Sequence, residues 1–322
     1  MKKLKALLTA EAAVCIALLT YVAATGELGA GGALYGVPFA QIGAGLRALS
    51  LSGAAGNAAA FVLYLLICLS PCAVLLLLRR RGSLCRDDIL LPVLSAVLFP
   101  LMYLLINPGL AASRLGMPGM KSMSAVLYNA LLLTLIAGYL VLRFMHSVSR
   151  ADEPKLHRYL KILLAVICAV FVFEAFGGCY SETLSLIEQT RLANSGMEDS
   201  LGLSNFFFWL RYAVMAAPCL LGVWVIFGGI RLIDALSADA YSEEAASLAK
   251  RLADISAKSL KIIVISQLAF NILELLFMEE LRNISISFYL PLAPLVVSLC
   301  MLLFAGYIGR GRAYRDENER FI

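Results

Sequence analysis

The sequence is poor in the residues that hold metals and cofactors. It contains only two histidines, and its eight cysteines occur without a CxxC pair or a histidine cluster beside them. Zinc and haem sites require grouped nitrogen and sulfur ligands, so we expect no metal and no cofactor. The sequence also lacks a P-loop, an HExxH motif and a GxSxG motif, which carry nucleotide, peptide and ester hydrolysis. We therefore expect no catalytic residues and a protein that is not an enzyme.

Charged residues are scarce as well. They make up 15% of the chain, whereas 61% of the residues are hydrophobic and the mean hydropathy is +0.84. Soluble proteins average about 25% charged residues, so the composition predicts an all-α, polytopic integral membrane protein in a lipid bilayer. The formal net charge of +5 is compatible with an acidic partner. Basic residues gathered at one membrane face explain it more directly, so we expect no nucleic-acid partner.

Long apolar runs predict about eight transmembrane helices, because roughly 20 apolar residues cross a bilayer. The predicted spans are residues 6–25, 58–78, 89–106, 124–145, 162–176, 205–232, 262–281 and 286–308. The first run follows a basic MKKLK and exceeds the usual core of a signal peptide, so we interpret it as an uncleaved span. Cleavage of a signal peptide after this run is the alternative.

Lysine and arginine concentrate in alternate connections, which predicts the orientation because positively charged loops stay cytoplasmic. Most of them lie in the N-terminus, the turn at 79–88, the linker near residue 150, the region 231–261 and the C-terminal tail. The opposite side holds only Arg47, Arg114, Lys121, Arg191 and Arg282. With an even number of spans, both termini are expected in the cytoplasm.

Mixed charges and a proline in the linker 146–161 divide the chain into two predicted halves, 1–150 and 151–322, with four spans each. Pro71-Cys72 and Pro218-Cys219 occur in the second span of each half. Repeated halves are common in transporters, and their substrates bind at the interface of the repeats. Duplication and coincidence both explain a match of two residues, so both interpretations stay open.

The stretch 36–53 is too polar to span the membrane and too apolar for a free loop. Apolar residues recur at helical spacing after Pro38, which predicts an amphipathic interfacial or re-entrant helix on the outer side. Its polar residues Gln41 and Arg47, together with Glu11 in the first span, are secondary candidates for a ligand site.

Ionisable residues inside predicted spans are the best indicators of a site, because burying a charge in hydrocarbon costs roughly 2.5–3.5 kcal/mol. Glu174, Arg211 and Glu274 are the main residues of this kind. Gln267 and Asn271 precede Glu274 on the same face of one predicted helix. These five residues are the primary candidates for binding a ligand or ion.

The depths of the three charged residues agree. Glu174 and Glu274 each lie thirteen residues beyond a lysine, Lys161 and Lys261, which is about 20 Å along a helix. Arg211 lies about 9 Å from the outer end of its own span. We therefore predict a Glu174–Arg211–Glu274 cluster that opens outward. The alternative is a structural ion pair plus a glutamate that snorkels to the interface.

A charged amphipathic helix at 242–258 is predicted to run without a break into the next span, with Ser242 as its cap. The basic tail 309–322 follows the last span. The charged residues of these two elements are Lys250, Arg251, Asp254, Lys258, Arg310, Arg312 and Arg315. Two interpretations stay open, a helix that lies on the inner membrane surface and a docking surface for a cytoplasmic protein.

Two short motifs in the second half match the pattern of one bacterial membrane family. Asp239 to Glu244 match a D/G-x-(F/Y)-(S/T)-x-E segment, and residues 317–322 match a tail similar to E-N-D-x-x-I, with Glu319 in place of Asp. On these motifs, residues 160–322 resemble the family catalogued as domain of unknown function 2975. The resemblance implies a bacterial cytoplasmic membrane and an accessory role beside small transcriptional regulators. The first half is an additional four-span block outside the family's pattern.

We expect a membrane-embedded sensor, regulatory or accessory protein that binds a small or lipidic ligand in a polar cavity of the outer leaflet. Its expected partners are the lipid bilayer, that ligand and a cytoplasmic protein. The alternative is a secondary transporter that moves a small solute with the intramembrane carboxylates. Exchangeable carboxylates and a fixed cation serve either use, so the sequence leaves both open.

Overall fold

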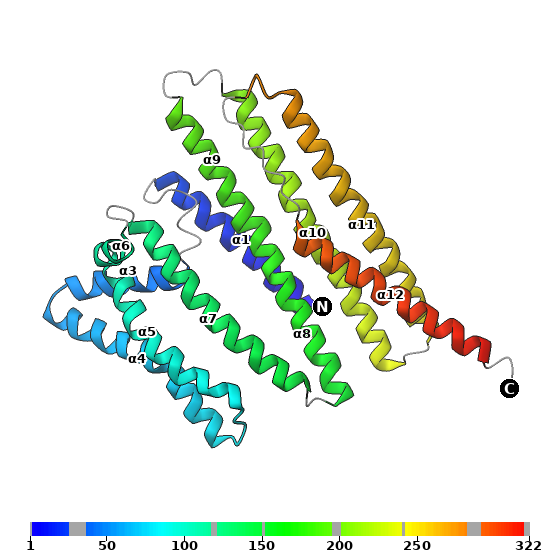
Figure 1. Cartoon of the computed structure of the whole chain (residues 1–322), viewed down its shortest axis with the longest axis horizontal. Coiled ribbons are helices and arrows are strands. Elements are labelled where there is room, and N and C mark those ends of the chain that lie inside the picture. Colours follow the sequence, from blue (N-terminus) through cyan, green and yellow to red (C-terminus); the bar gives the residue numbers. More distant parts are fainter. Residues whose placement is uncertain are drawn as a thin grey trace. The chain divides into compact units, whose positions relative to one another are not determined.

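The computed structural model describes residues 2–25, 37–116, 121–149, 152–194, 201–239, 242–281 and 291–318. Within these ranges all regular secondary structure is helical (Figure 1). Eight of the helices are long and apolar enough to cross a membrane. The predicted all-α class and the predicted number of candidate spans are therefore confirmed.

The chain forms two compact units. Unit 2, Gly26–Asp152, contains α3 (Phe39–Leu51), α4 (Ala54–Arg80), η1 (Arg86–Ile89), α5 (Leu90–Ile106), α6 (Pro108–Arg114) and α7 (Lys121–Ser149). Unit 1, Met1–Thr25 with Glu153–Ile322, contains α1 (Lys2–Thr25), α8 (Glu153–Phe173), η2 (Glu174–Gly178), α9 (Cys179–Ala193), α10 (Gly202–Ala238), α11 (Glu243–Leu276) and α12 (Leu292–Asn318). The predicted halves, 1–150 and 151–322, had grouped the first helix with the N-terminal spans, whereas by contacts it belongs with the C-terminal ones.

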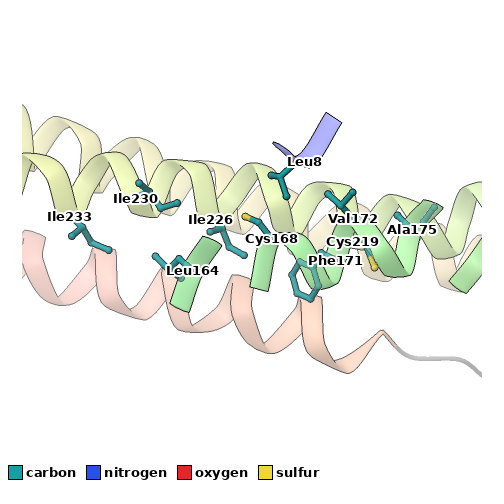
Figure 2. Close-up of a cluster of buried hydrophobic side chains, with 11 residues drawn as sticks. Leu8, Leu164, Cys168, Phe171, Val172, Ala175, Cys219, Ile226, Ile230 and Ile233 are labelled. Carbon is teal, nitrogen blue, oxygen red and sulfur yellow. The ribbon is translucent and has the colours of Figure 1, made fainter. Parts of the chain in front are cut away.

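The apolar core of unit 1 explains the placement of α1. Leu8 of α1 packs into a cluster built by α8 and α10, where apolar residues recur at helical spacing (Figure 2). On α10, Gly222 lets Phe171 of α8 approach closely, since a Cβ at Gly222 would lie 2.5 Å from the ring. Cys168 and Cys219 fill the same core as small apolar groups.

The core of unit 2 is centred on α5. Leu94, Leu98, Leu101 and Leu105 follow helical spacing and pack with residues of α3, α4 and α7. The Ser95 hydroxyl donates a hydrogen bond of 2.6 Å to the carbonyl of residue 68 on α4, so this polar group is satisfied inside the core.

The fifth span differs from its prediction. The sequence indicated a span at 162–176 followed by a polar loop to Ser204, but α8, η2 and α9 join into one helical rod that ends at Ala193 (Figure 1). The polar residues of α9 are tolerated in this helix because several of them face inward: Ser181, Thr183 and Thr190 are all buried. A stretch that is polar in composition is therefore part of the bundle.

Two other predicted elements are present. The stretch 36–53 contains helix α3, as its spacing predicted. Helix α11 continues without a break from Glu243 to Leu276, and Ser256 and Ser259 lie buried within it. The Ser242 hydroxyl accepts a hydrogen bond of 3.1 Å from the backbone N–H of Ala245, which confirms the predicted cap.

Candidate functional site

A π-helical segment, η2, interrupts the α8–α9 rod at Glu174. Single π turns inside α-helices are frequent at functional sites. Gly178 closes the segment, and a Cβ there would lie 2.8 Å from a carboxylate oxygen of Glu174. The glycine thus leaves room for this carboxylate beside the helix backbone. Glu174 is half-buried, and no described residue forms a hydrogen bond or an ion pair with it.

Arg211, which lies on α10 inside a predicted span, pairs with a glutamate of α9. Its Nη2 lies 3.2 Å from Oε1 of Glu182. Arg211 is buried, whereas the Glu182 side chain is 48% exposed. Glu182 follows Glu174 by eight residues, about two helical turns, and the two carboxylates are within electrostatic reach of each other. Glu182 was missed at the level of sequence because its segment was interpreted as a loop.

A small cavity lies between α10 and α11 beside Arg211. Its volume is about 10 Å³, which is the space that one water molecule needs. Glu274, Gln267 and Asn271 line it from one face of α11, as their spacing predicted. The Gln267 side chain donates a long hydrogen bond of 3.5 Å to the carbonyl of Val214 on α10. The polar face of α11 therefore meets the arginine of α10.

Glu274 is the least satisfied charged group of this cavity. It is only 9% exposed, and no described residue forms a hydrogen bond or an ion pair with it. It lies within electrostatic reach of Arg211 without contacting it. Arg211 thus stands between a paired carboxylate, Glu182, and an unpaired one.

The predicted cluster is assembled in part. Arg211, Gln267, Asn271 and Glu274 line one cavity. Glu174 does not contact the arginine. It lies within electrostatic reach of Glu182, which is the partner of Arg211. The group offers one fixed cation for an anionic group and several carboxylates for a cation, an amine or a proton.

The secondary candidates lie elsewhere. Glu11 is half-buried on α1, which packs against η2 and α9 within unit 1. Gln41 and Arg47 belong to unit 2, where Arg47 donates a hydrogen bond of 3.1 Å to the carbonyl of Ile106 at the end of α5. This contact ties α3 to α5 and gives Arg47 a structural role.

The basic surface is described in part. Lys250, Arg251, Asp254 and Lys258 are all exposed on α11. The side chains of Arg310, Arg312 and Arg315, and the end of the tail at 319–322, lie outside the described part of the chain. The described basic surface is therefore that of α11.

A second ionic cluster, in unit 2, was not predicted. Asp88 is 1% exposed, pairs with Arg143 and accepts hydrogen bonds from the Tyr139 hydroxyl at 2.9 Å and the Cys85 N–H at 2.8 Å. It caps η1, which leads into α5, and fastens it to α7. Asp88 was counted with the basic turn at 79–88, and only the packing of the two helices brings Arg143 to it.

No family model, curated protein or solved structure matches the chain. Among the residues that the structure describes, no group of three histidine, cysteine, aspartate or glutamate side chains has a geometry suited to a metal ion.

Proposed function

We propose that this protein is a membrane-embedded sensor or accessory regulator in a bacterial cytoplasmic membrane, with both termini in the cytoplasm. It binds a small ligand in unit 1, at the cluster of Glu182, Arg211 and Glu274. The orientation is supported by the excess of lysine and arginine in one set of connections. The bacterial membrane and the regulatory role are supported by the resemblance of residues 160–322 to domain of unknown function 2975.

The observation that carries the proposal is Glu274, which is only 9% exposed and lines the cavity beside Arg211. It has no hydrogen-bonding partner among the described residues, and its neighbour Arg211 already pairs with Glu182. Burying a carboxylate in this way costs stability, so a side chain with a purely structural role would be neutral or fully paired. Charged groups kept inside a membrane despite this cost commonly serve binding or translocation.

The charge balance indicates the class of ligand. The three carboxyl groups of Glu174, Glu182 and Glu274 outnumber Arg211, the cation among them. A small cationic or zwitterionic solute fits this balance, with its ammonium group at the carboxylates and any anionic group at Arg211. The cavity has a volume of about 10 Å³, room for about one water, so binding a larger solute requires α10 and α11 to separate.

Sensing is favoured over transport by the continuity of α11. This helix carries Gln267 to Glu274 near one end and the charged segment 242–258 at the other. Its 34 residues extend over about 50 Å, so a displacement at the cluster can reach the cytoplasmic segment through one rigid element. The second candidate, a secondary transporter, is favoured by the π segment at Glu174, since irregular helices at ligand depth are typical of transporters.

The first test is binding by the purified full-length protein in detergent. Melting temperatures are measured with ammonium, putrescine, choline and glycine betaine, because a ligand at 100 times its Kd stabilises a protein by about 2.7 kcal/mol. We expect at least one solute to raise the melting temperature of the parent and of Glu279→Gln, an exposed charge change beyond the end of α11. Glu274→Gln is expected to lose the response. An equal response in Glu274→Gln, or no response in the parent, contradicts the proposal.

A second test separates the two candidates. The solute that binds is applied to vesicles that contain the parent protein, and hydrogen exchange is followed in the segment 242–258. Altered exchange without solute flux identifies a sensor. Flux that Glu274→Gln abolishes identifies a transporter instead.

A further inference from the structure

A second cavity of unit 1 lies at the opposite end of α11 from Glu274. Its volume is about 120 Å³, roughly ten times the space that one water needs, and three helices, α1, α10 and α11, line it. Each of them contributes one cation: Lys5, Arg231 and Arg251. The cluster proposed above uses none of these residues.

The three cations have no anionic partner among the described residues. All three side chains are exposed, none forms an ion pair, and no carboxylate lines the cavity. The Lys5 ammonium lies 5.7 Å from the centre of the Phe227 ring, which holds it at the cavity. Three like charges around one space repel one another, and an anion between them would remove that repulsion.

The helix periodicity builds this arrangement. Trp224, Gly228 and Arg231 share one face of α10, and Leu248, Arg251 and Ile255 share the facing side of α11. Gly228 brings the two helices close, since a Cβ there would lie 3.0 Å from a methyl group of Leu252. Apolar side chains thus form most of the cavity wall, and the three cations lie beside them. An amphiphile with an anionic headgroup requires this combination.

We propose that this cavity binds the phosphate-bearing headgroup of an anionic phospholipid. Arginine is suited to phosphate because its planar guanidinium donates two parallel hydrogen bonds. Basic pockets between helices on the cytoplasmic side of a membrane bind lipid headgroups in this way. Trp224, which is 57% exposed at the cavity, supplies the aromatic group that sits at a membrane interface. An exposed apolar neighbour of this kind favours a lipid over free phosphate.

The tryptophan also supplies the test. The chain has two tryptophans, so Trp209→Phe leaves Trp224 as the only indole. The full-length variant is reconstituted in phosphatidylcholine vesicles that contain a small fraction of brominated lipid, which quenches nearby indole fluorescence. We expect brominated phosphatidylglycerol to quench Trp224 more strongly than brominated phosphatidylcholine. From the fraction quenched at increasing lipid content, we expect a preference of about tenfold or more, because one basic residue near a membrane contributes roughly fivefold and three line this cavity.

Matched variants give the decisive comparison. Arg231→Gln with Arg251→Gln is expected to abolish the preference, and Arg231→Lys with Arg251→Lys to retain most of it. Lys250→Gln, an exposed charge change next to the cavity but outside its lining, is expected to keep it. Unchanged quenching in the double glutamine variant overturns the proposal, and so does an equal loss in Lys250→Gln. Addition of inorganic phosphate separates the sources: if phosphate removes the preference where chloride of equal ionic strength does not, the site binds free phosphate and the lipid assignment is wrong.

Discussion

Unit 1 and unit 2 each place an arginine and a carboxylate among apolar helices, and the two pairs are satisfied to very different extents. In unit 2, Asp88 is almost fully buried and is bound by Arg143, the Tyr139 hydroxyl and a backbone N–H. In unit 1, Arg211 pairs with the half-exposed Glu182, while Glu274 lies buried beside it with no described hydrogen-bonding partner.

This difference distinguishes a structural ion-pair network from a candidate ligand-binding site. A buried charge whose hydrogen bonds are all made holds its helices together, and removing one partner leaves the others unpaired. A buried charge that lacks partners lowers the stability of the fold and is free to receive a ligand. Substitutions in each cluster distinguish these two roles.

The largest effect is expected from Asp88→Ala. The change removes the partner of Arg143, of the Tyr139 hydroxyl and of the capped N–H, and should lower the stability by about 3 kcal/mol. Thermal unfolding in detergent measures it. Asp87→Ala removes the same charge from the neighbouring, less buried position and is expected to have little effect. Equal losses in the two variants would mean that the Asp88 cluster does not fasten α5 to α7.

A smaller effect is expected at the π segment. Alanine at position 178 would meet the Glu174 carboxylate, so Gly178→Ala should destabilise the parent but not a protein that already carries Glu174→Ala. The double-mutant cycle should give a coupling energy of about 1 kcal/mol. Additive losses in melting experiments would show that the carboxylate does not lie against Gly178.

The smallest effect is expected at the Arg211 and Glu182 pair. Glu182 is 48% exposed, so solvent screens the pair and a double-mutant cycle with Arg211→Gln and Glu182→Gln should give less than about 1 kcal/mol. Glu188→Gln on the same helix serves as the control. Glu188 pairs with Arg191, so its substitution is expected to show no coupling energy with Arg211→Gln. A coupling energy as large as that of a buried ion pair would mean that Arg211 and Glu182 have a structural role, as Asp88 and Arg143 have in unit 2.

Helical periodicity and apolar runs predicted much of the helical architecture. The candidate spans follow from apolar runs, and Gln267, Asn271 and Glu274 fall on one face of α11 because they repeat at helical spacing. The unbroken course of α11 followed from the same pattern. These features are local, so neighbouring residues in the chain suffice to define them.

The rest depends on packing between distant residues. Glu182 sits in a polar stretch that is typical of a loop, and its inward-facing neighbours are visible only once α9 lies against α10. Arg143 meets Asp88 across 55 positions of sequence. The apolar sequence of α1 does not indicate which helices it packs against. Composition cannot decide such choices, because several partners bury an apolar or polar face equally well.

The most direct test of the central claim compares the unliganded melting temperatures of Asp88→Asn and Glu274→Gln. Each change replaces a buried carboxylate by a neutral amide of similar shape. We predict opposite signs: Asp88→Asn lowers the melting temperature because a complete network is broken, and Glu274→Gln raises it because the cost of burying an unpaired charge disappears. A loss in Glu274→Gln as large as that in Asp88→Asn would contradict the account, because it would make Glu274 a structural fastening of unit 1.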